Sequence, residues 1–355
     1  MNQVFDPKKP FSIYGFGNWG RQLRKNLESK GHKAEFFLDK RATPGQIVDG
    51  TKCLNLYELK QEKVTQVVIG VYNREVSPRS IQKLLTDGGV SVIITFQELL
   101  HYVNDVLKAS FWFDPKINLD KFQTELNSFK SILADDESIE TLEKLVIFRK
   151  TGKISDHLEG IGLEKQYFNV NIPGWLNKKS MIMLDCGAFN GDTILSAIEN
   201  KTSLSKAYCF EPDAKNFNLL HAKIKTLKGT EYILVPCATW SETKIISFQD
   251  SEGESSRVSE SSGSSVKAVS IDDFMANSPY DFLKIDVEGA DLDTLRGAIN
   301  SINTQRPYIA VGIYHRPSDL WEIPLFLNKN LKNYKYYLRQ HGHNGIDTVL
   351  YALPT

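Results

Sequence analysis

LDCGAFNGDT, residues 184–193, decides the fold of the second half of the chain. The apolar run MIML (181–184) leads into it, Gly187 and Gly191 follow, and a helical pattern opens near Thr193. Glycine lets the backbone turn sharply and approach a ligand closely, so this pattern is typical of a nucleotide-like site at the end of a strand. Asp185, at the carboxyl end of the strand, can reach such a ligand. An ordinary strand-to-helix turn is the alternative.

Apolar runs continue after this loop and alternate with helical patterns, which predicts a largely parallel sheet. The pair KIISFQ and VKAVSI is expected to form an added hairpin around a polar surface loop at 251–266. The other strand candidates are KAYCFE (206–211), EYILVPCA (231–238), DFLKID (281–286), YIAVGIY (308–314), KYYLRQH (335–341) and DTVLYAL (347–353).

The second strand ends in CFEPD, and Glu211 is its last acid before Pro212. A carboxylate at this place can accept hydrogen bonds from both ribose hydroxyls of an adenosyl ligand, as it does in dinucleotide sites. An exposed acid at a strand end is the alternative, and the position after the glycine loop favours the ligand.

The fourth strand gives DFLKIDVEGAD, residues 281–291. In an extended segment, Asp286 and Glu288 would share one face at the edge of the sheet. Two carboxylates beside a nucleotide crevice suit proton abstraction, binding of a substrate hydroxyl, or a metal ion. The alternative is a plain strand end followed by a helix cap. Lys284 is expected to be a structural ion-pair partner rather than a nucleophile.

Together these pieces resemble the FkbM family of methyltransferases over about residues 180–353. The matching pieces are LDCGAFNGDT, FEPD, SIDDF (270–274), LKIDVEGAD with LRGA, and YHRPSDLWEIPLFL followed by TVLYAL. The resemblance implies an α/β fold with a seven-stranded sheet of order 3-2-1-4-5-7-6 and an antiparallel seventh strand. It also implies S-adenosylmethionine as cofactor and O-methylation, commonly of a sugar or polyketide hydroxyl.

Carried onto this sequence, the family pattern implies a set of cofactor contacts. Asp185, Gly187, Gly191 and Asp192 would form the loop around the methionine and adenosyl groups, Glu211 would bind the ribose, and Pro212 and Asp213 would lie beside the adenine. At the third strand the chain has CATWSE (237–242) where the family often has an Asn and an Ala-Leu-Ser-Asp-like string, so the remaining adenine contacts stay unassigned.

The acceptor hydroxyl must be aligned with the methyl group and must lose its proton. Asp286 and Glu288 are the leading candidates for the base, and His315, in YHRP after the fifth strand, is the third because histidine titrates near neutral pH. A packed or solvent-facing loop histidine is the alternative for His315. No metal-ligand spacing is evident, so we expect no metal.

The first half of the chain opens with YGFGNWGRQ (14–22), in which Gly15, Gly17 and Gly20 form GxGxxG between an apolar run and a helix. Asp39 ends the next apolar run, as in the dinucleotide fingerprint. The segment resembles nucleotide-binding domains attached to sugar-modifying acyltransferases and dehydrogenases. It predicts a Rossmann-like domain that binds a second nucleotide, a nucleotide-sugar, a partner, or nothing. An NAD(P)-dependent oxidoreductase or epimerase is the alternative function, but no YxxxK pair follows the fingerprint.

Length and composition bound the remaining possibilities. The 355 residues suggest two domains, which we place at 1–112 and 151–355 with a helical connection at 113–150. Lys plus Arg and Asp plus Glu number 43 each, so a general nucleic-acid partner is not expected. No apolar run is long enough to span a bilayer, and the four cysteines lack metal spacing. We expect a cytoplasmic protein with a small-molecule or carbohydrate acceptor; the oligomeric state stays open.

Overall fold

The computed structural model describes residues 4–249, 257–258 and 264–355, and the chain divides into two compact units. The first comprises Met1–Lys121, Thr141–Gly160 and Gly342–Ile346; the second comprises Phe122–Glu140, Ile161–His341 and Asp347–Thr355. This division differs from the predicted boundaries at 112 and 150. The expected helical connection is not a separate piece, because its residues are shared between the two units.

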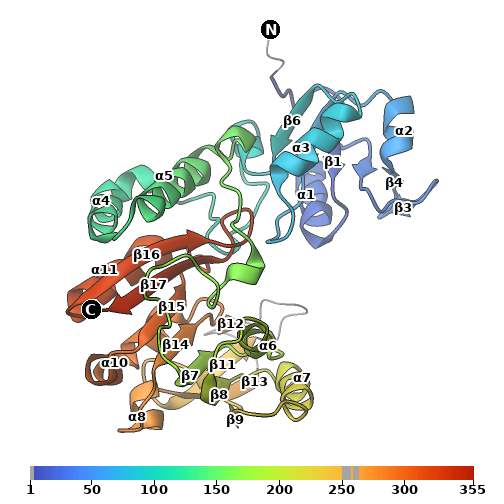
Figure 1. Cartoon of the computed structure of the whole chain (residues 1–355). Coiled ribbons are helices and arrows are strands. Elements are labelled where there is room, and N and C mark those ends of the chain that lie inside the picture. The colour runs from blue at the N-terminus through green and yellow to red at the C-terminus, as the bar shows by residue number, and fades with distance from the viewer. Residues whose placement is uncertain (1–3, 250–256, 259–263) are drawn as a thin grey trace. The chain divides into compact units, whose positions relative to one another are not determined.

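The first unit is built on a six-stranded sheet of order β3-β4-β2-β1-β5-β6 (Figure 1). Strands β4, β2, β1, β5 and β6 run parallel, as alternating strands and helices predict, while β3 pairs antiparallel with β4. The strands are β1 (Ser12–Tyr14), β2 (Phe37–Leu38), β3 (Ile47–Val48), β4 (Thr51–Leu54), β5 (Gln66–Ile69) and β6 (Val92–Thr95).

The β3–β4 hairpin is missing from our strand predictions. Val48 and Thr51 pair across a two-residue turn of Asp49 and Gly50, whose φ angles are 47° and 76°. Both angles lie in the left-handed region that a type I′ turn requires, and Asp-Gly is a preferred sequence for it. The Asp-Gly turn could be recognised in the sequence, but its two strands are too short, and their flanking residues too polar, to show a strand pattern.

The second unit is built on a seven-stranded sheet of order β16-β17-β15-β14-β7-β8-β9. When the strands of this sheet alone are numbered in chain order, the order from β9 to β16 is the predicted 3-2-1-4-5-7-6. Strand β17 runs antiparallel to β15 and β16. The strands are β7 (Met181–Cys186), β8 (Leu204–Phe210), β9 (Glu231–Val235), β14 (Phe282–Ile285), β15 (Tyr308–Gly312), β16 (Tyr334–Gln340) and β17 (Thr348–Pro354). Because β7 extends past the apolar run, Asp185 lies inside the strand.

A smaller sheet of order β10-β13-β11-β12 lies in the same unit. Its β11 and β13 pair antiparallel, which confirms the predicted hairpin; most of the loop expected at 251–266 lies outside the described residues. The strands are β10 (Ala238–Thr239), β11 (Lys244–Gln249), β12 (Arg257–Val258) and β13 (Ser264–Val269).

The helices follow the strands in the alternation that the sequence predicts. No helix of the described residues is long and apolar enough to cross a membrane. The helices are α1 (Asn18–Ser29), α2 (Leu56–Gln61), α3 (Pro78–Asp87), α4 (Gln123–Ile132), α5 (Asp136–Thr151), α6 (Asp192–Glu199), α7 (Ala214–Ile224), α8 (Ile271–Met275), α9 (Asp291–Arg296), α10 (Ile299–Gln305) and α11 (Asp319–Asn330).

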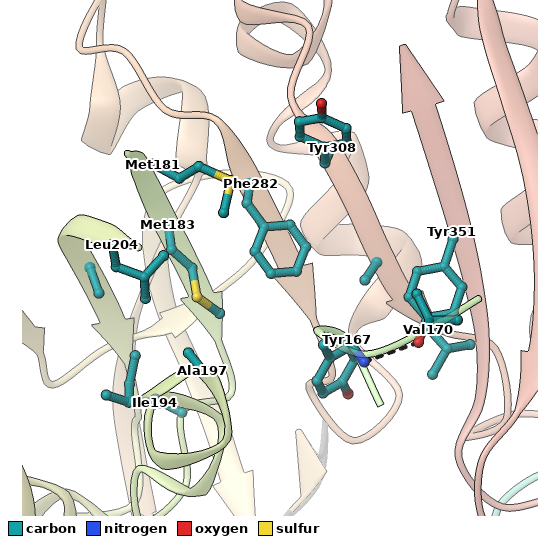
Figure 2. Close-up of a cluster of buried hydrophobic side chains, with 14 of the residues drawn as sticks. Tyr167, Val170, Met181, Met183, Ile194, Ala197, Leu204, Phe282, Tyr308 and Tyr351 are labelled. Carbon is teal, nitrogen blue, oxygen red and sulfur yellow. Dashed lines mark hydrogen bonds between the residues drawn. The ribbon is translucent and has the colours of Figure 1, made fainter. Parts of the chain in front are cut away.

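A buried apolar cluster fixes the strands that carry the candidate site (Figure 2). Met183 of β7, Phe282 of β14 and Ile194 of α6 all belong to it. Tyr167, from the segment that precedes β7, joins the same cluster, and its backbone N–H donates a 3.1 Å hydrogen bond to the Tyr351 hydroxyl (Figure 2). Packing and this hydrogen bond therefore hold the pre-strand segment against the sheet.

Candidate active site

The glycine loop after β7 is shaped by contact with the neighbouring strand end. Gly187 has a φ of 81°, and a Cβ atom there would lie 2.0 Å from the backbone oxygen of Asp286. Gly191, with a φ of 84°, caps the N-terminus of α6. The loop therefore needs glycine at 187 both for its left-handed conformation and for close packing on the chain that leaves β14.

Asp185 and Lys284 form a buried ion pair below this loop. Lys284 Nζ lies 3.0 Å from Asp185 Oδ1, and the carboxylate is fully buried. Asp185 Oδ2 accepts no hydrogen bond from any described residue. Burial raises the pKa of Asp185 to about 6, although the Lys284 charge opposes the rise. A buried carboxylate oxygen with unused acceptor capacity is what a polar ligand at the loop would satisfy.

Glu211 follows β8 directly, and its carboxylate turns back toward the glycine loop. Phe189 N donates to Oε2 at 2.9 Å, and Asp213 N donates to Oε1 at 2.8 Å. Burial raises the pKa of Glu211 to about 7 against the lowering effect of these two N–H groups. Each carboxylate oxygen can accept more than one hydrogen bond, so the pair of oxygens can still receive two ligand hydroxyls.

The other predicted cofactor residues surround these two acids. Asp213 is the N-cap of α7 and accepts a 2.8 Å hydrogen bond from Asn216 N, so it has a structural role besides the predicted adenine contact. Pro212 lies between Asp213 and Glu211 and is partly buried, and Asp192 is exposed at the start of α6. Their contacts with a cofactor stay predictions.

Asp286 lies one residue beyond β14 and is held by three donors. Tyr167 donates its hydroxyl to Oδ2 at 2.8 Å, Tyr314 donates to Oδ1 at 3.2 Å, and His315 Nε2 lies 3.0 Å from Oδ1. Burial alone would raise the pKa of Asp286, but the hydrogen bonds and charges of His315 and Lys284 hold it well below its usual range. Asp286 is therefore an ionised carboxylate, and 18% of its side chain stays exposed.

His315 does not fit the predicted role of general base. Its Nδ1 lies 2.8 Å from Asp291 Oδ2 and its Nε2 faces Asp286, so each ring nitrogen has a carboxylate partner. Burial favours the neutral ring, but the Asp291 charge and both hydrogen bonds raise the pKa of His315 well above its usual value. A fully buried imidazolium between two carboxylates cannot take a proton from a substrate. Its position and charge instead orient Asp286.

We expect His315 to remain doubly protonated throughout the neutral range. In nitrogen NMR spectra of protein labelled at histidine, one imidazole should keep the shifts of an imidazolium at pH values where an ordinary histidine, with a pKa of about 6.5, has lost its proton. His315→Gln should remove that signal and leave the other histidines unchanged. A signal from His315 that titrates near pH 6.5 would contradict the charge assignment.

Glu288 departs from the geometry that its alternation with Asp286 suggested. Strand β14 ends at Ile285, and Glu288 has a φ of 53°, so the chain there is no longer extended. The expectation that the two acids share a face because they alternate along a strand is therefore wrong. Glu288 still lies close enough to influence the charges of Tyr314 and His315.

Asp286, Asp291 and His315 also offer ligand atoms close enough together to surround a metal ion. The two carboxylates, however, face opposite nitrogens of the same ring. One cation cannot bind both nitrogens of one imidazole, and the observed contacts already match each carboxylate with a ring N–H. The positive charge of the imidazolium accounts for this cluster of acids.

Three residues of this network had no role in our predictions. Asp291 and Tyr314 lie within the quoted motifs, but nothing in their spacing shows that they contact His315 and Asp286. Tyr167 lies before β7, the first strand of the second unit, and outside every quoted motif. Its hydroxyl reaches Asp286 only because the pre-strand segment packs on the sheet, which is a long-range contact without a local sequence signal.

The residues of the predicted second nucleotide site lie between β1 and α1, in the first turn of α1 and after β2 in the first unit. A Cβ at Gly20 would lie 2.1 Å from the oxygen of Gly15, so both glycines serve the close packing of α1 on β1, while Gly17 is exposed with open space around it. Asp39, however, pairs through both carboxylate oxygens with Arg41, at 3.0 Å each. The acid expected to bind a ribose thus already has a partner, and a ligand here stays a prediction.

In comparison with known proteins, residues 185–338 match the family model of the methyltransferase FkbM domain. The matched range begins at Asp185 and contains Glu211, Lys284, Asp286 and His315, whereas Tyr167 lies outside it. Among curated proteins, no significant match was found.

Among solved structures, methyltransferase FkbM from Methylobacillus flagellatus KT is similar with a TM-score of 0.78 and 20% identity, over 97% of this chain and 89% of that chain. At this identity the likeness shows a shared fold. An rRNA methylase from Streptococcus thermophilus matches at 16% identity and a TM-score of 0.33, over 50% of this chain and 88% of that one. A methyltransferase-like protein of Streptococcus mutans in complex with SAH matches at 12% identity and a TM-score of 0.32, over 49% of this chain and 89% of that chain. These two scores are too low to support an argument.

Proposed function

We propose that the second unit, whose residues 185–338 match the family model of the methyltransferase FkbM domain, is an S-adenosylmethionine-dependent O-methyltransferase acting on a hydroxyl of a sugar or glycan precursor. The observation that carries this proposal is the position of Asp185 and Glu211 at the carboxyl ends of the adjacent parallel strands β7 and β8, with Phe189 N of the glycine loop donating to Glu211. Ligands of open α/β sheets bind at this edge.

The residues present fit the cofactor. The ribose hydroxyls would donate to Glu211, and Asp185 with the loop around Gly187 would hold the methionine end, where Asp185 Oδ2 lacks a donor among the described residues. When bound, S-adenosylmethionine supplies a methyl group that is already electrophilic on a sulfonium. The protein has to supply alignment and a proton acceptor.

Asp286 is the best placed proton acceptor. It is ionised, partly exposed, and fixed by Tyr167, Tyr314 and His315, so its orientation costs little when a substrate arrives. A hydroxyl donates a hydrogen bond to such a carboxylate and becomes far more acidic as its oxygen gains a methyl group. Even a weak base can then take the proton, which favours an oxygen acceptor.

The carbohydrate class of the acceptor rests on the family resemblance. Within the segment 315–321, Trp321 is buried and stacks on Phe122 with ring centroids 4.3 Å apart. It is therefore not available to stack on a sugar ring.

The direct test is methyl transfer from S-adenosylmethionine labelled in its methyl group to a panel of sugars and nucleotide-sugars. The proposal predicts label on an acceptor oxygen, and loss of at least about 100-fold in rate for Asp286→Asn, because general-base catalysis contributes this much. Asp293→Asn, on α9 and paired with Arg296 rather than with the groups around Asp286, is the matched control. Label on nitrogen acceptors only, or equal rates for the two variants, would overturn the O-methylation assignment.

Affinity for S-adenosylhomocysteine should depend on pH through Glu211. The carboxylate form accepts the ribose hydroxyls, and its pKa of about 7 means that this form is lost below neutral pH. We therefore expect affinity about tenfold weaker at pH 6 than at pH 8, with net proton release on binding near pH 7. Calorimetry in buffers of different ionisation enthalpy measures both. Proton uptake, or stronger binding at pH 6, would show that the protonated acid is the binding form.

A further inference from the structure

Lys284 lies at the centre of the candidate site although the proposed chemistry gives it no task. It belongs to β14, directly between β7 and β15, and its register partner on β7 is Asp185. Only 2% of the residue is exposed, so its ammonium cannot rely on water. A lysine in this environment persists only where charge and hydrogen bonds compensate its desolvation.

Three acceptors of the preceding strand and loop surround the Lys284 ammonium. Nζ lies 3.0 Å from Asp185 Oδ1, and it donates to the backbone oxygens of Gly187 at 2.6 Å and Cys186 at 3.3 Å. These contacts match the three N–H donors of an ammonium group. One side chain thereby fixes both the charge of Asp185 and the course of the backbone into the glycine loop.

We propose that Lys284 is the positioning residue of the cofactor loop, holding the backbone oxygens of Cys186 and Gly187 and keeping Asp185 ionised for the ligand. The inference rests on the proposed S-adenosylmethionine function. Lys284 is neither nucleophile nor base in this role. Gly187 is packed against the oxygen of Asp286 on its other side, so the loop is held between the side chain and the backbone of the same strand region.

The groups around Asp185 give this role a measurable signature. Asp192 at the start of α6 and Asp286 beyond β14 are the acids that face it, Cys186 on its own strand and Cys209 on β8 are the thiols, and Lys284 is the cation. Both acids oppose ionisation of Asp185, and Lys284 favours it. Lys284 favours ionisation of Glu211 as well, so removing the cation should move the ionisation of both carboxylates, and with it ligand binding, to higher pH.

The test compares the wild-type chain with Lys284→Met by calorimetric titration of S-adenosylhomocysteine from pH 6 to pH 9. Wild type should bind tightly from about pH 7 upward. Lys284→Met should bind at least about tenfold more weakly at pH 7 and regain part of this affinity at pH 9. The pH below which its affinity falls should be higher than in wild type by about one unit or more. Lys206→Met is the matched control, because this half-buried lysine of β8 pairs with Glu231 away from the loop, and it should bind as wild type does.

Two results would overturn the proposal. One is a Lys284→Met protein with the wild-type affinity and pH profile; the other is a loss that stays constant from pH 6 to pH 9, which a merely structural role would give. Should Lys284→Met fail to fold, Asp185→Asn and the double variant Asp185→Asn/Lys284→Met replace it. The single variant keeps the cation on the loop and should bind at least about fivefold more tightly than the double variant, whereas equal affinity would contradict the role. Wild-type protein that does not bind at all would overturn the proposed function itself.

Discussion

Replacing Gly187 with alanine is expected to destabilise the second unit by about 3 kcal/mol or more. A left-handed conformation costs a non-glycine residue about 1–2 kcal/mol, and overpacking in a rigid site costs about 1–3 kcal/mol. Here the new Cβ would lie 2.0 Å from the oxygen of Asp286 and 3.3 Å from a Val287 methyl group, and a backbone atom cannot step aside. Urea unfolding of the full chain, followed by tryptophan fluorescence, to which Trp175, Trp240 and Trp321 of this unit contribute, measures the loss.

Gly229→Ala is the matched control for this variant. Gly229 also has a left-handed φ, 93°, but a Cβ there would meet nothing within 4 Å. Gly229→Ala should lower the free energy of unfolding only by the cost of the left-handed conformation, about 1–2 kcal/mol. Equal losses at both positions would show that the tight approach of the loop to Asp286 is not what requires glycine at 187.

Changing Glu211 to glutamine is expected to weaken binding of S-adenosylhomocysteine about 100-fold at pH 8. Two hydrogen bonds from ribose hydroxyls to a carboxylate contribute about 1.5–3 kcal/mol each, and the neutral amide retains part of this. Glutamine keeps the shape of the side chain, so the contacts with Phe189 N and Asp213 N can persist through its single carbonyl oxygen only in part. Calorimetry gives the affinity. Thermal unfolding without ligand shows how much the substitution changes the stability of the protein itself.

Glu199→Gln, exposed at the end of α6, controls for the change of charge near the site. It should leave affinity within about twofold of wild type, because exposed charges at a distance are screened. Unchanged affinity in Glu211→Gln would mean that the ribose does not bind at this carboxylate, and the cofactor would have to lie elsewhere on the sheet edge.

The sequence predicted the parts of the fold and site that depend on local patterns. The sharp turn at Gly187 and the ion pair of Lys284 could be predicted because both residues lie at strand ends next to the glycine loop. The cofactor contacts assigned to Gly191 and Glu211 stay predictions. The family model of the methyltransferase FkbM domain matches residues 185–338, the range in which the ordered motifs lie. The strand order came from the same resemblance and matches the observed sheet.

Features that depend on long-range contacts were missed or assigned wrongly. Tyr167 reaches Asp286 through the packing of a segment without any motif. His315 was a candidate base because histidine titrates near neutral pH. Asp291 and Asp286, on either side of its ring, instead raise its pKa well above the neutral range. The extended pattern at Glu288 also failed, because the backbone turns left-handed there.

The division of the chain is a further example. Residues 342–346 belong to the first unit although they lie near the end of the chain, and the Trp112 indole donates a 2.7 Å hydrogen bond to the oxygen of Asn344 there. A boundary drawn from composition is a single point along the chain. It cannot represent a unit assembled from three separate segments.

The most direct test of the central claim is a crystal structure of the full chain grown with S-adenosylhomocysteine. The account predicts ligand density across the carboxyl ends of β7 and β8, with both ribose hydroxyls within hydrogen-bond distance of Glu211 and the methionine end at Asp185. Density at the Gly17 loop of the first unit instead, with the second unit empty at saturating ligand, would contradict the account and move the nucleotide chemistry to the other half of the chain.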